Sequence, residues 1–257
     1  MPDFNDLLTS VNLKPQEPED LKTFSILVHG LAGTGKSSFA STASKVAEMS
    51  PVLYIDFESG TMPLAEWGDL SQITIIHITD WQDMINLYSK VLVPTLRSGE
   101  FPYKTVVFDT LDKMQELIVK HFAKVNNQDG YAKWAAAYDA ALEVMSLFLN
   151  NPAVNFIAIT HTSREVNDVT GEVMISPDFE GKKSGRKFPS LFDFVGYMHW
   201  VQTDEDTMVP VLTTRDESTV AKTRISKFPR NLGNPTMQRV YDTISAAIDN
   251  TGKADND

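Results

Sequence analysis

The 257-residue chain contains no cysteine, and its positive charges are outnumbered by its negative ones. Without a thiol, disulfides, thiolate nucleophiles and zinc knuckles are excluded. The chain also lacks an apolar run long enough to span a bilayer and a basic, then apolar, leader, so we expect a soluble, cytoplasmic protein with no membrane partner. With 23 Lys and Arg against 34 Asp and Glu, the net charge of −11 argues against nucleic-acid binding over the whole surface. Any nucleic-acid site must be a local basic patch.

An apolar segment at residues 24–29 runs into a glycine-rich segment that satisfies G-x-x-x-x-G-K-[ST], the phosphate-binding loop. Glycines permit backbone conformations closed to other residues, so that successive N–H groups surround a phosphate. Lys36 would reach the β- and γ-phosphates, and the Ser37 hydroxyl would bind Mg²⁺. A helix expected at residues 37–49 would direct its positive end toward the same phosphates. The predicted nucleotide contacts are Gly30, Leu31, Ala32, Gly33, Thr34, Gly35, Lys36, Ser37 and Ser38.

Apolar, strand-like segments then alternate with helical patterns, which predicts an α/β fold with a mainly parallel sheet and helices on both faces. The expected strands are residues 24–29, 51–58, 73–77, 103–109 and 154–161. The expected helices are residues 81–97, 111–124, 131–149 and 236–249, and Pro94 should kink or break the first of these. Between residue 161 and the last helix the pattern predicts hairpins, one turning near Gly171 and one at residues 203–207.

We expect one domain at residues 23–249, preceded by a flexible acidic arm at 1–22 and followed by a disordered polar tail at 250–257. The arm is interrupted by proline and has room for about one helical turn. Its apolar residues Phe4, Leu7 and Leu8 would either dock on a neighbouring subunit or cap the domain's own core.

Acidic residues stand at the carboxyl ends of two strands, where open α/β sheets bind ligands. Asp109 ends an apolar strand, the pattern of a Walker B carboxylate that binds Mg²⁺ beside Ser37; otherwise it is a solvated strand end or a helix cap. Asp56 and Glu58 are two residues apart in an expected strand, so both would face the γ-phosphate. Glu58 would then be the general base that deprotonates the attacking water, unless it caps the next turn.

Thr160 and His161 end the fifth expected strand. A polar side chain at this place can respond to the γ-phosphate and pass the nucleotide state to the segment that follows. The alternative is an ordinary surface histidine.

The phosphate loop, Glu58, Asp109 and His161 resemble, in this order, the RecA-like ATPases. In RecA-type proteins the catalytic Glu lies on the strand after the phosphate-loop helix, whereas in many other P-loop families it directly follows the Walker B Asp. Here the residue after Asp109 is Thr110, which favours the RecA branch.

Within that branch, the short chain and hairpin-rich C-terminal part look most like the phage-encoded nucleotide-binding proteins related to RecA and RadA, including phage single-strand-annealing ATPases. The resemblance covers about residues 23–230. It implies a RecA-like P-loop core with C-terminal β-hairpins, ATP and Mg²⁺ as cofactors, and a homo-oligomer with ATP near the subunit interfaces.

A segment near the C-terminus is similar to the Lys-Asn-Arg-Phe-Gly motif of RadA-type proteins, whose basic residues reach the nucleotide of the adjacent subunit. Lys222 and Arg224 match this motif, whereas Thr223, Ile225 and Ser226 do not. Two cations supplied by a neighbour would stabilise transition-state charge and make hydrolysis depend on assembly. The alternative is a solvated edge strand.

Residues 180–189 form the strongest basic patch of this acidic chain, and their glycines predict a mobile loop with Phe188 beside it. The loop follows the His161 strand, where RecA-type proteins place a loop that binds single-stranded DNA. Its cations would neutralise backbone phosphates while Phe188 stacks on bases. The alternative is a solvated loop, or one that contacts ATP across an interface. The predicted DNA-binding residues are Lys182, Lys183, Arg186 and Lys187.

The residues and the resemblance together predict a Mg²⁺-dependent ATPase that acts on single-stranded DNA in phage recombination or annealing, with a single-strand-binding or replication protein as a further partner. The expected catalytic residues are Glu58, Lys36, His161, Lys222 and Arg224. One alternative is a nucleotide-dependent switch, like a helicase loader, that recruits a replication partner without touching DNA. Another is a motor that translocates along DNA, although the sequence shows no helicase motifs.

Overall fold

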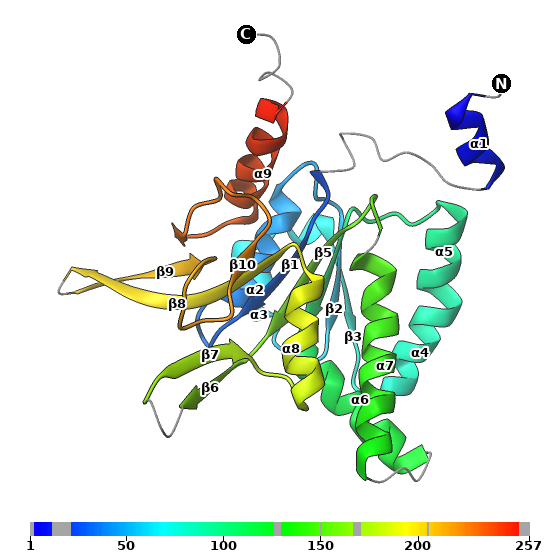
Figure 1. Ribbon diagram of the computed structural model, residues 1–257, viewed down its shortest axis with the longest axis horizontal. Helices are drawn as coiled ribbons and strands as arrows, with labels where there is room; N and C mark the ends of the chain where they lie inside the picture. Colours follow the sequence, from blue (N-terminus) through cyan, green and yellow to red (C-terminus); the bar gives the residue numbers. More distant parts are fainter. Residues whose placement is uncertain are drawn as a thin grey trace.

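A mainly parallel sheet forms the centre of the protein (Figure 1). The computed structural model describes residues 3–11, 22–125, 130–149, 151–166, 171–204 and 206–251. Nine strands of this part form one sheet in the order β11-β9-β8-β1-β5-β4-β2-β3, with β10 beside β8, and β6 and β7 pair separately. The strands are β1 (Ser25–His29), β2 (Val52–Asp56), β3 (Ile73–His77), β4 (Thr105–Asp109), β5 (Asn155–Thr160), β6 (Thr162–Val166), β7 (Val173–Pro177), β8 (Phe194–Asp204), β9 (Thr207–Thr213), β10 (Lys222–Thr223) and β11 (Asn231–Gly233). Strands β8, β1, β5, β4, β2 and β3 are parallel to their neighbours in this row, whereas β9, β10 and β11 join antiparallel.

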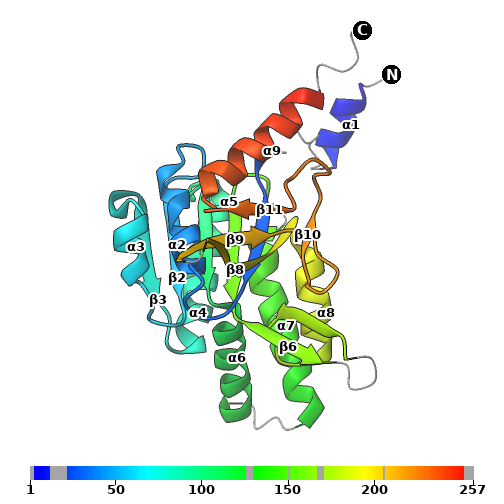
Figure 2. The ribbon, with the colours of Figure 1, turned by 90° about the vertical axis from the view of Figure 1, so that its left-hand side faces the viewer.

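Helices cover both faces of the sheet, and Figure 2 shows α2 and α3 on one side and α7 and α8 on the other. The helices are α1 (Phe4–Ser10), α2 (Lys36–Ser41), α3 (Met62–Trp67), α4 (Trp81–Leu87), α5 (Val93–Ser98), α6 (Leu111–Val125), α7 (Gly130–Leu149), α8 (Lys182–Leu191) and α9 (Met237–Thr251). Alternate residues of each strand divide between two buried clusters: Ile26 and Val28 pack with α2 and α9, whereas Leu27 packs with α6 and α7. The expected α/β fold with flanking helices and C-terminal hairpins is confirmed.

The helix after the phosphate loop is shorter than expected. Helix α2 ends at Ser41 and a 3₁₀ turn, Thr42–Lys45, follows it. The hydroxyls of Ser41, Thr42 and Ser44 each donate to the carbonyl oxygen three residues earlier, at 2.6–2.7 Å. Such local bonds compete with continued α-helix, so the apparent helical run to residue 49 is broken early.

The break expected at Pro94 is present. A π-helical turn, Tyr88–Leu92, divides the expected helix at residues 81–97 into α4 and α5, and Pro94 lies in the first turn of α5. Proline is tolerated there because its missing N–H would have no partner in the first turn.

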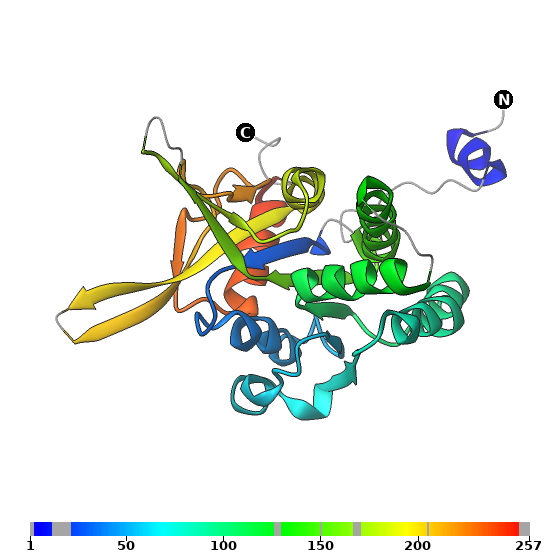
Figure 3. The same cartoon turned by 90° about the horizontal axis from the view of Figure 1, so that it is seen from below.

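Two antiparallel hairpins follow β5, as the pattern predicted. The β6–β7 hairpin includes Gly171, and the rest of its expected turn, residues 167–170, lies outside the described residues. The β8–β9 hairpin extends well beyond the sheet (Figure 3), and Glu205 in its turn also lies outside the described residues. A short 3₁₀ turn, Leu70–Gln72, precedes β3.

Both ends of the chain differ in detail from the expectation. Helix α1 lies within the expected arm, and Phe4 and Leu7 are exposed, so they do not cap the domain's core. Most of the expected arm, at residues 12–21, and most of the expected tail, at residues 252–257, lie outside the described residues. Helix α9 continues to Thr251. In the described part of the chain, no helix has the length and apolarity needed to cross a bilayer.

Candidate active site

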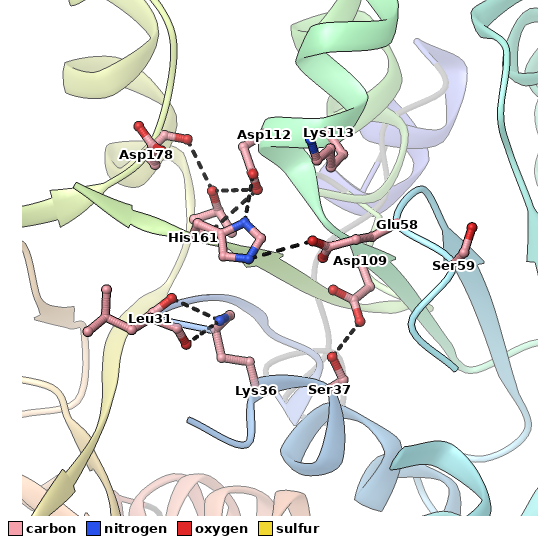
Figure 4. A network of polar contacts seen from close by, with 12 residues as sticks. Leu31, Lys36, Ser37, Glu58, Ser59, Asp109, Asp112, Lys113, His161 and Asp178 are labelled. Atoms are coloured by element: carbon pink, nitrogen blue, oxygen red, sulfur yellow. Dashed lines mark hydrogen bonds and ion pairs between the residues drawn. The ribbon is translucent and has the colours of Figure 1, made fainter. Parts of the chain in front are cut away.

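The register of the parallel strands brings four strand ends to one edge of the sheet. His29, the last residue of β1, pairs with Thr160, and Asp56 pairs with Asp109. Because β5 lies between β1 and β4, His161 stands beside both the phosphate loop and Asp109 (Figure 4).

The glycines of the phosphate loop are required for two different reasons. Gly33 and Gly35 have φ angles of 77° and 91°, in the left-handed region that disfavours a side chain. At Gly30 the constraint is space, because a Cβ there would collide with the backbone carbonyl oxygen of Met198 on β8. The Thr34 hydroxyl donates to the carbonyl oxygen of Leu31 at 2.8 Å and closes the loop.

Lys36 is a buried cation inside this loop. Its Nζ donates to the carbonyl oxygens of Gly30 at 2.8 Å and Leu31 at 2.9 Å. Burial lowers the pKa of the ammonium, and the carboxylates of Asp109, Glu58 and Asp112 oppose that shift. The cation therefore stands between the phosphate loop and a group of carboxylates.

Asp109 meets the phosphate loop through Ser37. The Ser37 hydroxyl donates to Asp109 Oδ2 at 2.7 Å, and the buried hydroxyl of Tyr54 on β2 donates to the same oxygen. Burial raises the pKa of the Asp109 carboxyl, and the two hydroxyl donors oppose this rise. No sequence pattern singled out Tyr54, whose one signal was a polar atom between the apolar residues Leu53 and Ile55.

The residues around Asp109 fit a divalent cation. Mg²⁺ prefers oxygen ligands and takes one or two protein groups together with substrate phosphates. The Ser37 hydroxyl and the Asp109 carboxylate supply such oxygens, and the buried Thr110 Oγ1 next to them has no hydrogen-bond partner in the described part of the chain. The described residues contain no cluster of three His, Cys, Asp or Glu that could hold a metal by itself.

The expectation that Asp56 and Glu58 share a face is wrong. Strand β2 ends at Asp56, so the alternation of a strand does not extend to Glu58. Asp56 is 2% exposed and turns back to accept the backbone N–H groups of Glu58 and Ser59, each at 2.9 Å. Glu58 is exposed and faces His161.

His161 lies between Glu58 and Asp112, and Asp112 follows Asp109 by three residues (Figure 4). Its Nδ1 lies 2.8 Å from Asp112 Oδ2, and its Nε2 lies 3.7 Å from Glu58 Oε1. A carboxylate only accepts, so Nδ1 carries a proton and Nε2 is the atom that faces Glu58. The backbone N–H of His161 and the hydroxyl of Thr160 also donate to Asp112.

Asp112 is a site residue that sequence analysis missed. It lies in the first turn of α6, where a carboxylate is common for helix-dipole reasons alone. Its spacing three residues after Asp109 was the available signal.

Most of the predicted phosphate-loop and catalytic residues line one cavity of about 260 Å³. The lining residues are Ala32, Gly33, Gly35, Lys36, Ser37, Ser38, Glu58, Pro63, Asp109, Thr110 and His161. Leu31 does not line it and is exposed, and Thr34 is buried. The arrangement provides backbone N–H groups, one cation, a hydroxyl–carboxylate pair and a second carboxylate around one space.

The basic segment expected as a mobile loop is helix α8. Its aromatic residue Phe188 is 1% exposed and stacks on Tyr138, with ring centroids 5.1 Å apart, so it is not available to stack on a base. Lys183 Nζ lies 3.9 Å from the centroid of the Tyr138 ring. Arg186 and Lys187 are exposed. The glycines suggested a loop, but burial of Phe188 in the core favours the helix.

Lys222 and Arg224 lie near the amino ends of β1 and β8, away from the cavity of their own chain. Lys222 Nζ donates to the carbonyl oxygens of Ser190 and Phe192, at 2.8 and 2.5 Å, and so satisfies the end of α8. Arg224 lies 3.1 Å from Asp193. Their action on a neighbour's nucleotide stays a prediction.

The chain was compared with curated proteins, with solved structures and with protein families. Among curated proteins, none matches the chain. Solved structures that resemble it include the flagellar accessory protein FlaH from Methanocaldococcus jannaschii, at 10% identity over 91% of this chain and 92% of that chain, with a TM-score of 0.44. An ATPase from the type III secretion system of pathogenic bacteria matches at 11% identity over 68% of this chain and 52% of that chain, with a TM-score of 0.48. The RadB recombinase matches at 13% identity over 82% and 88%, with a TM-score of 0.42.

These similarities are too weak to carry an argument about function. A family described as an AAA domain, in contrast, matches residues 22–225, which is most of the chain. The chain therefore belongs to this AAA-domain family.

Proposed function

We propose that the protein hydrolyses ATP in a Mg²⁺-dependent reaction at the cavity between the phosphate loop and His161. The observation that carries this proposal is the Glu58–His161–Asp112 chain beside Lys36, Ser37 and Asp109, because a water-activating carboxylate and phosphate-binding groups then share one space. The adenine base is inferred from the family resemblance alone, so GTP belongs in the same assay as a competing substrate.

The phosphate loop and Lys36 would bind and orient the phosphates. Backbone N–H groups near Gly33 and Gly35 surround the β-phosphate, and Lys36 exchanges its loop carbonyl partners for β- and γ-phosphate oxygens. Ser37 and Asp109 would hold Mg²⁺, whose charge neutralises the phosphate oxygens.

Glu58 would act as the general base. It takes a proton from a water aligned for in-line attack on the γ-phosphorus, while Lys36 stabilises the charge that develops on the γ-phosphate oxygens. His161, held by Asp112, lies beside the carboxylate of Glu58 and would hold it when Nε2 also carries a proton. A histidine in this position also changes partners when a γ-phosphate arrives, which gives the expected response to nucleotide state.

The first test is Glu58→Gln. This variant should bind ATP normally and lower the turnover number by about 10²- to 10⁴-fold, because the amide cannot accept the proton. Glu66→Gln, which changes an exposed carboxylate on the neighbouring α3, is the matched control and should be fully active. Full turnover by Glu58→Gln would remove Glu58 as the base.

We also propose that hydrolysis serves an action on single-stranded DNA, as in phage recombination or annealing, by a homo-oligomer with Lys222 or Arg224 near a neighbour's nucleotide. This part is based on the resemblance and on the cations of α8. The position of α8 supports a response to nucleotide: Gln115 on α6 donates to the Glu180 carbonyl and to the Ser184 hydroxyl, at 2.8 and 3.2 Å. Helix α6 also carries Asp112, which contacts His161, so one helix contacts both the candidate active site and α8.

Steady-state ATPase with and without single-stranded DNA tests this second part. DNA should stimulate the parent but not a variant with Lys182, Lys183, Arg186 and Lys187 changed to Ala. Contacts to about four phosphates would give a log–log slope of affinity against salt near −3. Equal, unstimulated turnover in both proteins would favour the alternative, a nucleotide-dependent switch that recruits a protein partner. The acidic net charge and the buried Phe188 are the observations that favour this alternative.

A further inference from the structure

Asp56 is a buried carboxylate next to the cavity that does not line it. Its Oδ1 accepts two consecutive backbone N–H groups, those of Glu58 and Ser59, at 2.9 Å each. A carboxylate that accepts the N–H groups two and three residues later closes a turn, and its charge makes these hydrogen bonds stronger than those to a neutral acceptor.

The second oxygen of Asp56 joins this turn to the neighbouring strand. Asp56 Oδ2 lies 3.2 Å from Nδ1 of His77, the last residue of β3, which pairs with Asp56 in the sheet. Nε2 of the same ring lies 2.9 Å from the Ser59 hydroxyl. Asp56, His77 and Ser59 therefore form a closed ring of contacts around the segment that contains Glu58.

The backbone of this segment is held in a conformation that needs such support. Ser59 has a φ of 66°, in the left-handed region that a serine rarely adopts. On the other side of Glu58, the N–H of Phe57 donates to the carbonyl oxygen of Asp109 at 2.7 Å. Glu58 thus lies between one residue bonded to the Walker B strand and one bonded to Asp56.

We infer that Asp56 is a positioning residue of the hydrolytic site, which acts with His77 and Ser59 to hold the turn that directs the Glu58 carboxylate toward His161 and the cavity. This inference rests on the proposed function, because it assigns Asp56 to the same reaction as Glu58. It differs from the sequence expectation, in which Asp56 itself faced the phosphate.

A double-variant comparison isolates this role. Asp56→Ala should lower the turnover number by about 10- to 100-fold through misplacement of Glu58, with the dissociation constant for ATP unchanged within about twofold. Asp56→Ala combined with Glu58→Gln should be no slower than Glu58→Gln alone, because both changes remove the same step. Multiplied losses in the double variant, or normal turnover in Asp56→Ala, would overturn the inference.

Asp69 provides the matched control. Its Oδ1 likewise accepts two donors shortly after it in the chain, the N–H and the hydroxyl of Ser71 at 3.0 and 2.7 Å, at the start of the 3₁₀ turn before β3. Asp69→Ala should lower the melting temperature, because the turn loses its cap, and leave the turnover number unchanged. If Asp56→Ala does not fold, Asp56→Asn and His77→Gln replace it. Both should lower the turnover number, and the loss in Asp56→Asn should be partial, since one acceptor oxygen remains for the N–H groups of Glu58 and Ser59.

Amide hydrogen exchange separates this inference from the proposed function. In Asp56→Asn without nucleotide, the amides of Glu58 and Ser59 should exchange at least about tenfold faster than in the parent, because a neutral acceptor binds them less tightly. A parent protein without ATPase activity would contradict the proposed function, yet the exchange experiment would still test the turn. Unchanged exchange at both amides would overturn the positioning role.

Discussion

The two ends of the parallel sheet hold similar residues in different arrangements. At the amino ends of β1 and β8, Asp193 accepts donors from Ser25 and pairs with Arg224, while Lys222 donates to two carbonyl oxygens at the end of α8. At the carboxyl ends, Lys36 and Asp109 border a cavity. Both ends therefore contain a lysine and an aspartate at strand or helix termini, and at the carboxyl end these two residues line a cavity.

Whether a polar group lines a cavity therefore says more about its role than its residue type does. At the amino end, each charge meets partners in its own chain, so its removal should reduce stability. Burial lowers the pKa of Lys222 at the amino end and of Lys36 at the carboxyl end. At the carboxyl end, burial also raises the pKa of Asp109, and the hydroxyl of Thr110 is buried without a partner among the described residues. Groups kept at such a cost are typical of binding and catalytic sites.

The largest effect is predicted for removal of Lys36, the cation at the carboxyl end of the sheet. Lys36→Ala should reduce ATP turnover by at least about 10³-fold, because a preorganised charge on the γ-phosphate is lost. Lys45→Ala, an exposed lysine shortly after α2, is the control and should keep full activity. Steady-state phosphate release and nucleotide binding by calorimetry measure both variants, and normal turnover by Lys36→Ala would place the reaction elsewhere.

Lys222→Ala makes the same change at the amino end. If the residue only satisfies the end of α8, the variant should lose about 1–3 kcal/mol of unfolding free energy, since two carbonyl oxygens lose their donor, and should retain turnover. Urea unfolding measures the first quantity. A large loss of turnover without loss of stability would instead support action on a neighbour's nucleotide.

Asp109→Asn should change activity and stability in opposite directions. Turnover should fall by at least about 10²-fold, because the carboxylate that we propose as a Mg²⁺ ligand is lost. Without nucleotide, the melting temperature should rise, by about 2–4 °C for each kcal/mol of burial cost removed, because the variant buries no charge. Thermal unfolding beside a Mg²⁺ titration of ATPase activity tests both. A lower melting temperature would mean that the hydroxyls of Tyr54 and Ser37 outweigh the cost of burial.

Much of the carboxyl end could be predicted from sequence because local patterns determine it. The glycine spacing of the phosphate loop reflects backbone angles that other residues avoid, and Asp109 follows an unbroken apolar strand. Alternating strands and helices likewise predicted the parallel sheet. These signals lie within a few residues of the features they predict.

The remaining features depend on contacts between distant segments. Tyr54 meets Asp109 only because β2 and β4 are neighbours, and Asp112 reaches His161 only because β5 lies beside α6. Phe188 was misjudged for the same reason: its glycine-rich surroundings suggested a loop, but Tyr138, 50 positions earlier, provides the ring on which it stacks.

His29 extends the comparison, because it ends β1 at the carboxyl end but does not line the cavity. Its Nε2 donates to the Val220 carbonyl oxygen at 2.9 Å, and burial lowers its pKa from 6.5 to about 4. Between these two pH values the unfolded chain binds a proton that the folded protein does not. The group therefore favours folding fully above pH 6.5 and loses about 3 kcal/mol as the pH falls to 4.

Urea unfolding across this pH range tests the prediction. The free energy of unfolding of His29→Gln should fall less steeply than that of the parent between pH 6.5 and 4, by about 3 kcal/mol in total. His121→Gln, on α6, is the control and should follow the parent. Parallel curves for His29→Gln and the parent would show that His29 is protonated in the folded protein.

The smallest predicted effect concerns the support of the phosphate loop from β8. Nε1 of Trp200, a half-exposed residue at the base of the β8–β9 hairpin, donates to the carbonyl oxygen of Gly33 at 3.1 Å. Trp200→Phe keeps an aromatic ring but removes this bond, which is worth about 1 kcal/mol, so ATP affinity should fall about fivefold. Trp134→Phe, on α7, should bind ATP as the parent does. If Trp200→Phe also binds normally, the loop is held by Gly30, Lys36 and its own glycines, and the hairpin is free to serve another role.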